Sequence, residues 1–242
     1  MTKPLPVQFQ ATTLDALAGV TGRIAVLYEP GQPASPGFRR LDRLTRGALS
    51  RAAGSEAFGK LKPGEAMELA YPAGLAADTV LILRLARKAD QAQARKAGAA
   101  IGKGHGTEAS LILAEAHPRA ADIAFGLAMR AYDFDAHKTA EKPGKGPVHL
   151  MANAPEEVAR AAAPMAAVAE GVFLTRDLVN EPANVLTTHE FAARLAAMQE
   201  LGLDVEILEE AELAKLGMGA LLGVGQGSES PSKVVVMQWN GG

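Results

Sequence analysis

Short apolar runs alternate with segments of helical period along the first half of the chain, and this alternation constrains the fold most. Residues 23–29 and 78–85 are rich in leucine or β-branched residues between Gly, Pro or Asp, which is typical of buried strands, and residues 109–116 form a third such run. The alternation favours helices layered on a sheet over an all-α or all-β structure, so we predict the α/β fold class. The helical segments are residues 38–53, 88–104 and 119–132.

The composition indicates a soluble globular protein of one or two domains. The chain has 242 residues, is 48% hydrophobic and carries a formal net charge of -2, so nothing in its overall charge favours nucleic acid or an anionic membrane. Cysteine is absent, which excludes disulfides, thiol catalysis and thiolate metal sites. The start has no apolar signal core, and no unbroken apolar stretch reaches about 18 residues, so we expect a cytoplasmic protein without a membrane partner.

A lysine-, glycine- and proline-rich segment at residues 137–149 is the predicted linker. It separates an N-terminal α/β domain at residues 1–136 from residues 150–242. The second part is predicted to contain a strand at residues 148–153, a long helix at residues 154–180 that Pro164 kinks or breaks, and a helix capped by Thr188. Two further strands at residues 203–210 and 233–240 flank a short helix that Gly217 ends. Because the chain finishes on an apolar strand followed by Asn-Gly-Gly, we expect it to be cut short within this domain.

The glycines of residues 215–228 resemble a phosphate-binding loop at first sight. A dinucleotide site requires a strand before the glycines and a helix directly after them, but a helix precedes this segment and a strand follows it. Its spacing is GxGxxxG, and no GK[ST] follows. We therefore predict a closely packed loop and no nucleotide site. The glycines are Gly217, Gly219, Gly223, Gly225 and Gly227.

No metal or catalytic site emerges from residue spacing. Asp133, Asp135 and His137 would share one face of an extended segment and could offer hard ligands, but no second cluster completes a coordination shell. No GxSxG elbow is present. The carboxylate pairs Glu156/Glu157 and Glu209/Glu210 lie at predicted helix starts, where the helix dipole explains them. The five histidines are too far apart in sequence to form a helical pair.

A local basic region at residues 36–62 has an excess of five positive charges. Arg39, Arg43 and Arg46 are predicted to lie along one helix face, which could follow a phosphate backbone. No aromatic residue lies between the arginines, so a solvated helix face is the simpler interpretation.

Three segments resemble the leucyl aminopeptidase (cytosol aminopeptidase) family. They are TRDLVNEPANVLTTHEFA (residues 175–192), LGMGALLGVGQGS (residues 216–228) and, more loosely, YDFDAHKT (residues 132–139), in which His137 stands where the family tends to have an aromatic residue. The resemblance implies an N-terminal three-layer α/β domain of macro-domain type, a linker with a connecting helix, and the first part of a mixed-sheet catalytic domain. Before Tyr132 only the layout matches.

Members of this family remove N-terminal residues, often leucine, from peptides with two divalent ions such as zinc or manganese, and commonly assemble as hexamers. In such a site the two metals activate a bridging water and polarise the scissile carbonyl. The family's metal ligands and catalytic residues follow the strand represented here by residues 233–240, so they are expected beyond Gly242. We therefore assign no catalytic, cofactor-binding or metal residue in this chain, and expect the chain to be inactive alone with no metal bound.

Two alternatives remain open at this point. The N-terminal domain could be a non-catalytic module that binds nucleic acid or a nucleotide derivative, with the arginine helix as the feature that carries it. The chain could also be a structural or regulatory relative that has lost its catalytic half.

Overall fold

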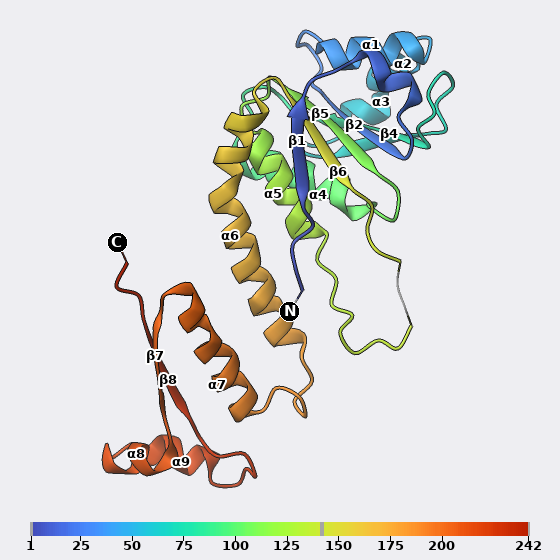
Figure 1. The fold of residues 1–242 in the computed structure, drawn as a ribbon. Coiled ribbons are helices and arrows are strands. Elements are labelled where there is room, and N and C mark those ends of the chain that lie inside the picture. Colours follow the sequence, from blue (N-terminus) through green and yellow to red (C-terminus); the bar gives the residue numbers. More distant parts are fainter. Residues whose placement is uncertain (1, 141–142, 242) are drawn as a thin grey trace. The chain divides into compact units, whose positions relative to one another are not determined.

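The computed structural model describes residues 2–140 and 143–241. Contacts between Cα atoms divide the chain into two compact units, Met1–Leu174 and Thr175–Gly242. Each unit is an α/β arrangement of its own, and each is described separately below (Figure 1).

The first unit is built on a six-stranded sheet of order β1-β6-β5-β2-β4-β3. All neighbouring pairs are parallel except β3 and β4, which are antiparallel, so the sheet is mixed. The central strands are buried on both faces, which agrees with their continuous apolar sequences. The strands are β1 (Val7–Ala11), β2 (Arg23–Tyr28), β3 (Ala66–Ala70), β4 (Thr79–Arg84), β5 (Ser110–Glu115) and β6 (Val148–Ala152).

Helices cover both faces of this sheet and make three layers (Figure 1). One core packs α4 (Gln91–Lys103) and α5 (Ala120–Arg130) against side chains such as Ala25 and Leu27 of β2. The opposite core packs three short helices and a 3-10 turn against side chains such as Ile24 and Val26. These elements are η1 (Asp15–Gly19), α1 (Pro36–Leu44), α2 (Ala48–Ala53) and α3 (Glu56–Gly59).

Glycines allow α4 and α5 to touch backbone to backbone. A Cβ at Gly98 of α4 would lie 1.9 Å from the carbonyl oxygen of Ile123, and one at Gly126 of α5 would lie 2.0 Å from that of Arg95. No real Cβ tolerates such distances. The small residues of these helices therefore fix how closely they pack.

The helix expected at residues 38–53 is two helices. Arg46 and Gly47 have φ values of 53° and 82°, a left-handed conformation that ends α1 and begins α2. The carboxylate of Asp42 accepts hydrogen bonds from the backbone N–H and hydroxyl of Ser50 and holds the two helices together. Leu41 and Leu49 of the predicted apolar stripe are buried, but a left-handed break separates the helices that carry them.

The segment at residues 148–152 was expected to follow a linker, in the second domain, and this placement is wrong. As β6 it lies between β1 and β5 of the first sheet, and the division between the units falls at Leu174/Thr175. The preceding residues are also tied to the first unit, because Nε2 of His105 donates to the carbonyl of Gly146 at 2.9 Å. The local sequence predicts this strand but not the sheet that it joins.

Helix α6 (Pro155–Asn180) is one continuous helix with Pro164 inside it, so of the predicted kink or break at that residue the break is ruled out. By length and composition alone, it is long and apolar enough to cross a membrane. An 18-residue stretch of it has a mean hydropathy of 1.3, and 11% of that stretch is buried. Core helices of soluble proteins pass the same test, so this property alone does not place α6 in a membrane.

The second unit is small and centred on the antiparallel pair β7 and β8. Its first helix begins one residue earlier than predicted, because the side chain of Thr187, rather than Thr188, accepts from the backbone N–H of Glu190. Among its described residues the fully buried hydrophobic side chains are Ala192 and Leu213. The elements are α7 (Thr188–Ala196), η2 (Ala197–Leu201), β7 (Asp204–Leu208), α8 (Glu210–Lys215), α9 (Gly219–Gly225) and β8 (Val234–Gln238).

Candidate functional site

The first unit has a crevice where the connections that leave two neighbouring parallel strands go to opposite faces of the sheet. After β2 the chain leads to α1 on one face, and after β5 it leads to α5 on the other. Open α/β sheets bind their ligands at such a point, outside the carboxyl ends of the strands. We call the cavity at this place the strand-end crevice.

The strand-end crevice has a volume of about 580 Å³, a size that suits a small molecule. Residues that follow β1, β2, β4, β5 and β6 line it, together with the first turn of α1. Its walls are partly apolar, and the ring of Tyr28 stacks on Phe38 at 4.5 Å between centroids. Its polar and charged members are Thr12, Glu29, Gln32, Ser35, Arg39, Arg87, Glu115, His117 and Asn153.

Glu115 has the most unusual conformation in the crevice. It ends β5 with a φ of 49°, a left-handed value that a residue with a Cβ adopts at a cost of about 1 to 3 kcal/mol. Its carboxylate is buried, and Oε1 accepts a hydrogen bond from the backbone N–H of Gly37 at 2.9 Å. A Cβ at Gly37 would lie 3.1 Å from Oε2, so a glycine there gives the carboxylate room to reach the helix.

The N-terminus of α1 therefore has no N–H left for a phosphate. Pro36 has no N–H, Gly37 donates to Glu115, Phe38 donates to the hydroxyl of Ser35, and Arg39 donates to the carbonyl of Ser35. The carboxylate of Glu115 already occupies the N-terminal end of α1, where the helix dipole attracts anions. Any anion placed directly at this helix end, phosphate or carboxylate, would meet a carboxylate of like charge.

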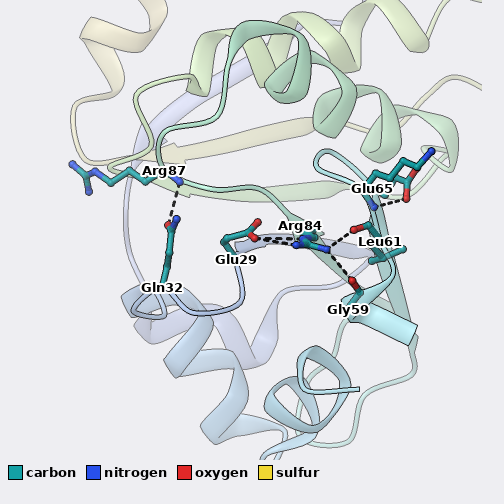
Figure 2. Close-up of polar contacts among 8 residues, drawn as sticks. Glu29, Gln32, Gly59, Leu61, Glu65, Arg84 and Arg87 are labelled. Carbon is teal, nitrogen blue, oxygen red and sulfur yellow. Dashed lines mark hydrogen bonds and ion pairs between the residues drawn. The ribbon is translucent and has the colours of Figure 1, made fainter. Parts of the chain in front are cut away.

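Glu29 is held by an ion pair at the rear of the crevice. Arg84, at the end of β4, lies 3.3 Å from Oε1 of Glu29 and also donates to the carbonyls of Gly59 and Leu61 (Figure 2). Beside this pair, the side chain of Gln32 accepts from the backbone N–H of Arg87. Arg84 therefore ties the end of β2 to the segment that follows α3, and its charge is already paired.

His117 closes the side of the crevice next to α5 and is held in one tautomer. Its Nδ1 accepts from the backbone N–H of Arg119 at 3.2 Å, so Nε2 carries the hydrogen that is donated to the carbonyl of Ala86 at 3.1 Å. Burial lowers the pKa of His117, and the neighbouring charges of Arg87 and Arg119 lower that pKa further, against the effect of the bond to Ala86. The imidazole is therefore neutral near pH 7.

Two cations of the crevice carry no ion pair within residues 2–140 and 143–241. Arg39 projects from α1 and Arg87 from the loop after β4, and both side chains are exposed. The charge of Glu29 is paired with Arg84, whereas the backbone hydrogen bond to Glu115 does not pair the charge of that carboxylate, so the crevice presents both cationic and anionic groups.

The residues weighed as metal ligands do not form a cluster in the described part of the chain. Asp133, Asp135 and His137 lie in an irregular segment after α5, where the ring of His137 packs against Phe134 at 5.7 Å between centroids. The described residues contain no group of three or more His, Asp or Glu side chains that could hold a metal ion.

Two other sequence expectations change in the structure. Arg39 and Arg43 lie one turn apart on α1, but Arg46 lies beyond its end, so the predicted row of three arginines contains two. The glycine-rich segment was expected as a closely packed loop, but residues 219–225 form α9, and a Cβ at Gly217, Gly219 or Gly223 would meet nothing within 4 Å. Alanine and leucine favour helix whereas the glycines oppose it, so propensity alone does not predict this element.

The segment of closest resemblance, residues 175–192, forms the end of α6, a tight turn and the start of α7. The backbone N–H groups of Val185 and Leu186 both donate to the carbonyl of Pro182. Arg194 of α7 then holds the segment, since its guanidinium lies 3.1 Å from Glu181 and 2.8 Å from Glu190. This motif is thus a braced turn at the beginning of the second unit.

Comparison with known proteins places the second unit in a described family. Residues 173–242 match the family model of the cytosol aminopeptidase family, catalytic domain, and this match begins within two residues of the division between the units. All of this chain aligns with half of a "Probable cytosol aminopeptidase" of Cereibacter sphaeroides at 62% identity, and with half of one of Dinoroseobacter shibae at 57% identity. The chain spans about half the length of the curated relatives it matches.

Solved structures share the fold. A bottromycin maturation enzyme, BotP, in complex with Mn matches 90% of this chain with 45% of its own, at a TM-score of 0.66 and 28% identity. A tomato leucine aminopeptidase mutant matches 97% of this chain with 50% of its own, at a TM-score of 0.75 and 20% identity, which compares the fold alone.

The fold and the matched segments define an α/β protein whose second unit matches the catalytic-domain model of the cytosol aminopeptidase family. The chain belongs to the leucyl aminopeptidase (cytosol aminopeptidase) family.

Sequence reasoning missed the strand-end crevice. Its signal was present, because Glu29, Glu115 and Asn153 directly follow or end predicted strands, and the carboxyl ends of parallel strands meet at one edge of a sheet. Locating the crevice requires the order of the strands in the sheet, and local sequence patterns do not reveal that order.

Proposed function

We propose that this chain is the N-terminal unit and the first part of the catalytic domain of a metallo-exopeptidase that releases N-terminal residues, leucine by preference, from peptides. The observation that carries the proposal is the 62% identity over all 242 residues to a relative named as a cytosol aminopeptidase. The name of that relative also supports a cytoplasmic location, and the family resemblance supports a homo-hexamer in the complete protein.

The described residues of this chain do not fit a two-metal centre of their own, because they contain no group of three or more suitable ligands. The solved complex of BotP with Mn supports a divalent metal such as Mn in the family, with Zn as the alternative. We infer that in the complete protein the metal ligands and catalytic groups follow Gly242, so no step of the reaction is assigned to a residue named here.

The test is a peptidase assay on two proteins. The 242-residue chain and the relative from C. sphaeroides would each be given leucine p-nitroanilide with and without Mn²⁺. We expect release of p-nitroaniline by the relative and none by the chain. Strong Mn²⁺-stimulated release by the chain would contradict the inferred position of the catalytic groups, and an inactive, folded relative would contradict the peptidase function.

A second candidate is nucleic-acid binding through the first unit. It is favoured by Arg39 and Arg43, which are exposed one turn apart on α1, while the nearby Asp42 is engaged by Ser50. A salt-dependent gel shift that is lost when Arg39, Arg43 and Arg46 are replaced would support it. No shift at low salt would remove it.

A further inference from the structure

Three properties of the strand-end crevice indicate which kind of ligand would fit it. It is large enough for a small molecule, its walls include the apolar side chains of Leu14, Leu27 and Leu85, and its lining includes the exposed, unpaired cations Arg39 and Arg87. A ligand that fits these properties has an anionic group and an apolar body.

The crevice suits a ligand whose anionic group is a carboxylate better than one whose anionic group is a phosphate. Phosphate sites in α/β folds rely on free backbone N–H groups at a helix N-terminus, and every N–H of the first turn of α1 is already used. On the α5 side, Asp122 stands in the first turn of the helix and pairs with Arg95 at 3.1 Å. Guanidinium groups bind carboxylates bidentately as well as phosphates, so Arg39 and Arg87 can hold a carboxylate without help from helix N–H groups.

Acceptors for a cation lie in the same cavity. Oε1 of Glu29 bonds to Arg84 and Oε1 of Glu115 bonds to Gly37, but neither Oε2 makes a hydrogen bond to any part of the chain that the structure describes. Both carboxylates line the crevice from its sheet side. An ammonium group could therefore bind to these oxygens in the same cavity as the arginines.

We propose that the strand-end crevice binds a free α-amino acid with an apolar side chain. Arg39 and Arg87 hold its carboxylate, the second oxygens of Glu29 and Glu115 receive its ammonium group, and the leucine and tyrosine walls contact its side chain. Such a site would let the first unit sense free amino acid. The choice of leucine as the probe rests on the proposed exopeptidase function, since leucine would be its product.

The test measures heat of binding, not hydrolysis, on the 242-residue chain, so it does not depend on peptidase activity. L-leucine would be titrated beside isocaproate, which lacks the ammonium group, isoamylamine, which lacks the carboxylate, and AMP, which carries a phosphate. We expect L-leucine to bind most tightly, isocaproate more weakly, and isoamylamine and AMP not at all.

Variants identify the site. Arg39→Met and Arg87→Met are each expected to weaken L-leucine binding about tenfold or more, because each removes a charge-assisted contact. Arg43→Met is the matched control, since it removes an exposed arginine of the same helix that does not line the cavity, and should leave binding unchanged. Far-UV circular dichroism checks that each variant is folded.

Three results would overturn the proposal. They are an absence of heat with L-leucine, tighter binding of AMP than of L-leucine, and equal affinity of the Arg39→Met and Arg87→Met variants with the unchanged chain. If L-leucine gave no heat of binding while the relative was active in the peptidase assay, the amino-acid site would be wrong and the proposed peptidase function would stand.

Discussion

Glu115 shows how one residue can stabilise a fold and shape a site. Its carboxylate satisfies the backbone N–H of Gly37, and its strained backbone directs it there. Replacing it with alanine leaves that N–H without an acceptor, so Glu115→Ala should lower the free energy of unfolding by about 1 to 3 kcal/mol. Glu115→Gln keeps an oxygen acceptor but loses the charge at the helix start, and should cost less, about 1 kcal/mol.

Urea denaturation followed by far-UV circular dichroism, which reports helix content, measures the free energy of unfolding of both variants and of the unchanged chain. If Glu115→Ala were as stable as the unchanged chain, the hydrogen bond to Gly37 would carry no stability.

His105 and His117 make the first unit sensitive to mild acid. Burial lowers the pKa of both imidazoles below the value in the unfolded chain, about 6.5. The unfolded state then binds more protons than the folded state, so stability is fully present above pH about 6.5 and falls as the pH drops toward the folded pKa values. Replacing both with glutamine should flatten the stability profile between pH about 7.5 and 5.

The check is the urea midpoint at several pH values for the double variant and for His137→Gln as the control, because His137 lies exposed in an irregular segment. A slope that is equally steep in the double variant would show that other groups cause it.

At the scale of elements, the packing of α4 on α5 is the contact most sensitive to one added carbon. A methyl group at Gly98 would lie 1.9 Å from the carbonyl of Ile123, so Gly98→Ala must push the helices apart. The cost of such overpacking is about 1 to 3 kcal/mol or more. Gly171→Ala on α6 is the control, because nothing lies within 4 Å of its Cβ position and alanine favours helix by up to about 1 kcal/mol.

Thermal unfolding of the two variants compares them directly. Gly98→Ala should unfold at a lower temperature than the unchanged chain, and Gly171→Ala should not. A Gly98→Ala variant as stable as the unchanged chain would mean that the helices are not in backbone contact.

Individual elements were well predicted from sequence where the pattern was local. The apolar runs of β2, β4 and β5 and the strands β7 and β8 are where periodicity and turn residues indicated them. The antiparallel edge strand β3 and the outer strand β1 were missed, because their alternation is short and only partly buried. The break between α1 and α2 depends on a left-handed Arg46, a conformation that residue type does not reveal.

At the scale of the whole molecule, the α/β class follows from the sequence, but the division of the chain does not. The proline- and glycine-rich segment resembles a domain linker, yet β6 beyond it pairs with β1 and β5, a contact that is distant in sequence. The family was recognised from residues 175–192 and 216–228, and the strand-end crevice was not, because it assembles from five separate strand ends.

The central claim is that this chain supplies the first part of an aminopeptidase. The most direct measurement joins residues 1–242 to the part of the C. sphaeroides relative that follows its aligned half, and assays leucine p-nitroanilide hydrolysis with Mn²⁺. We predict Mn²⁺-stimulated turnover by the joined protein, comparable to that of the intact relative. A folded joined protein without turnover, beside an active relative, would contradict the claim.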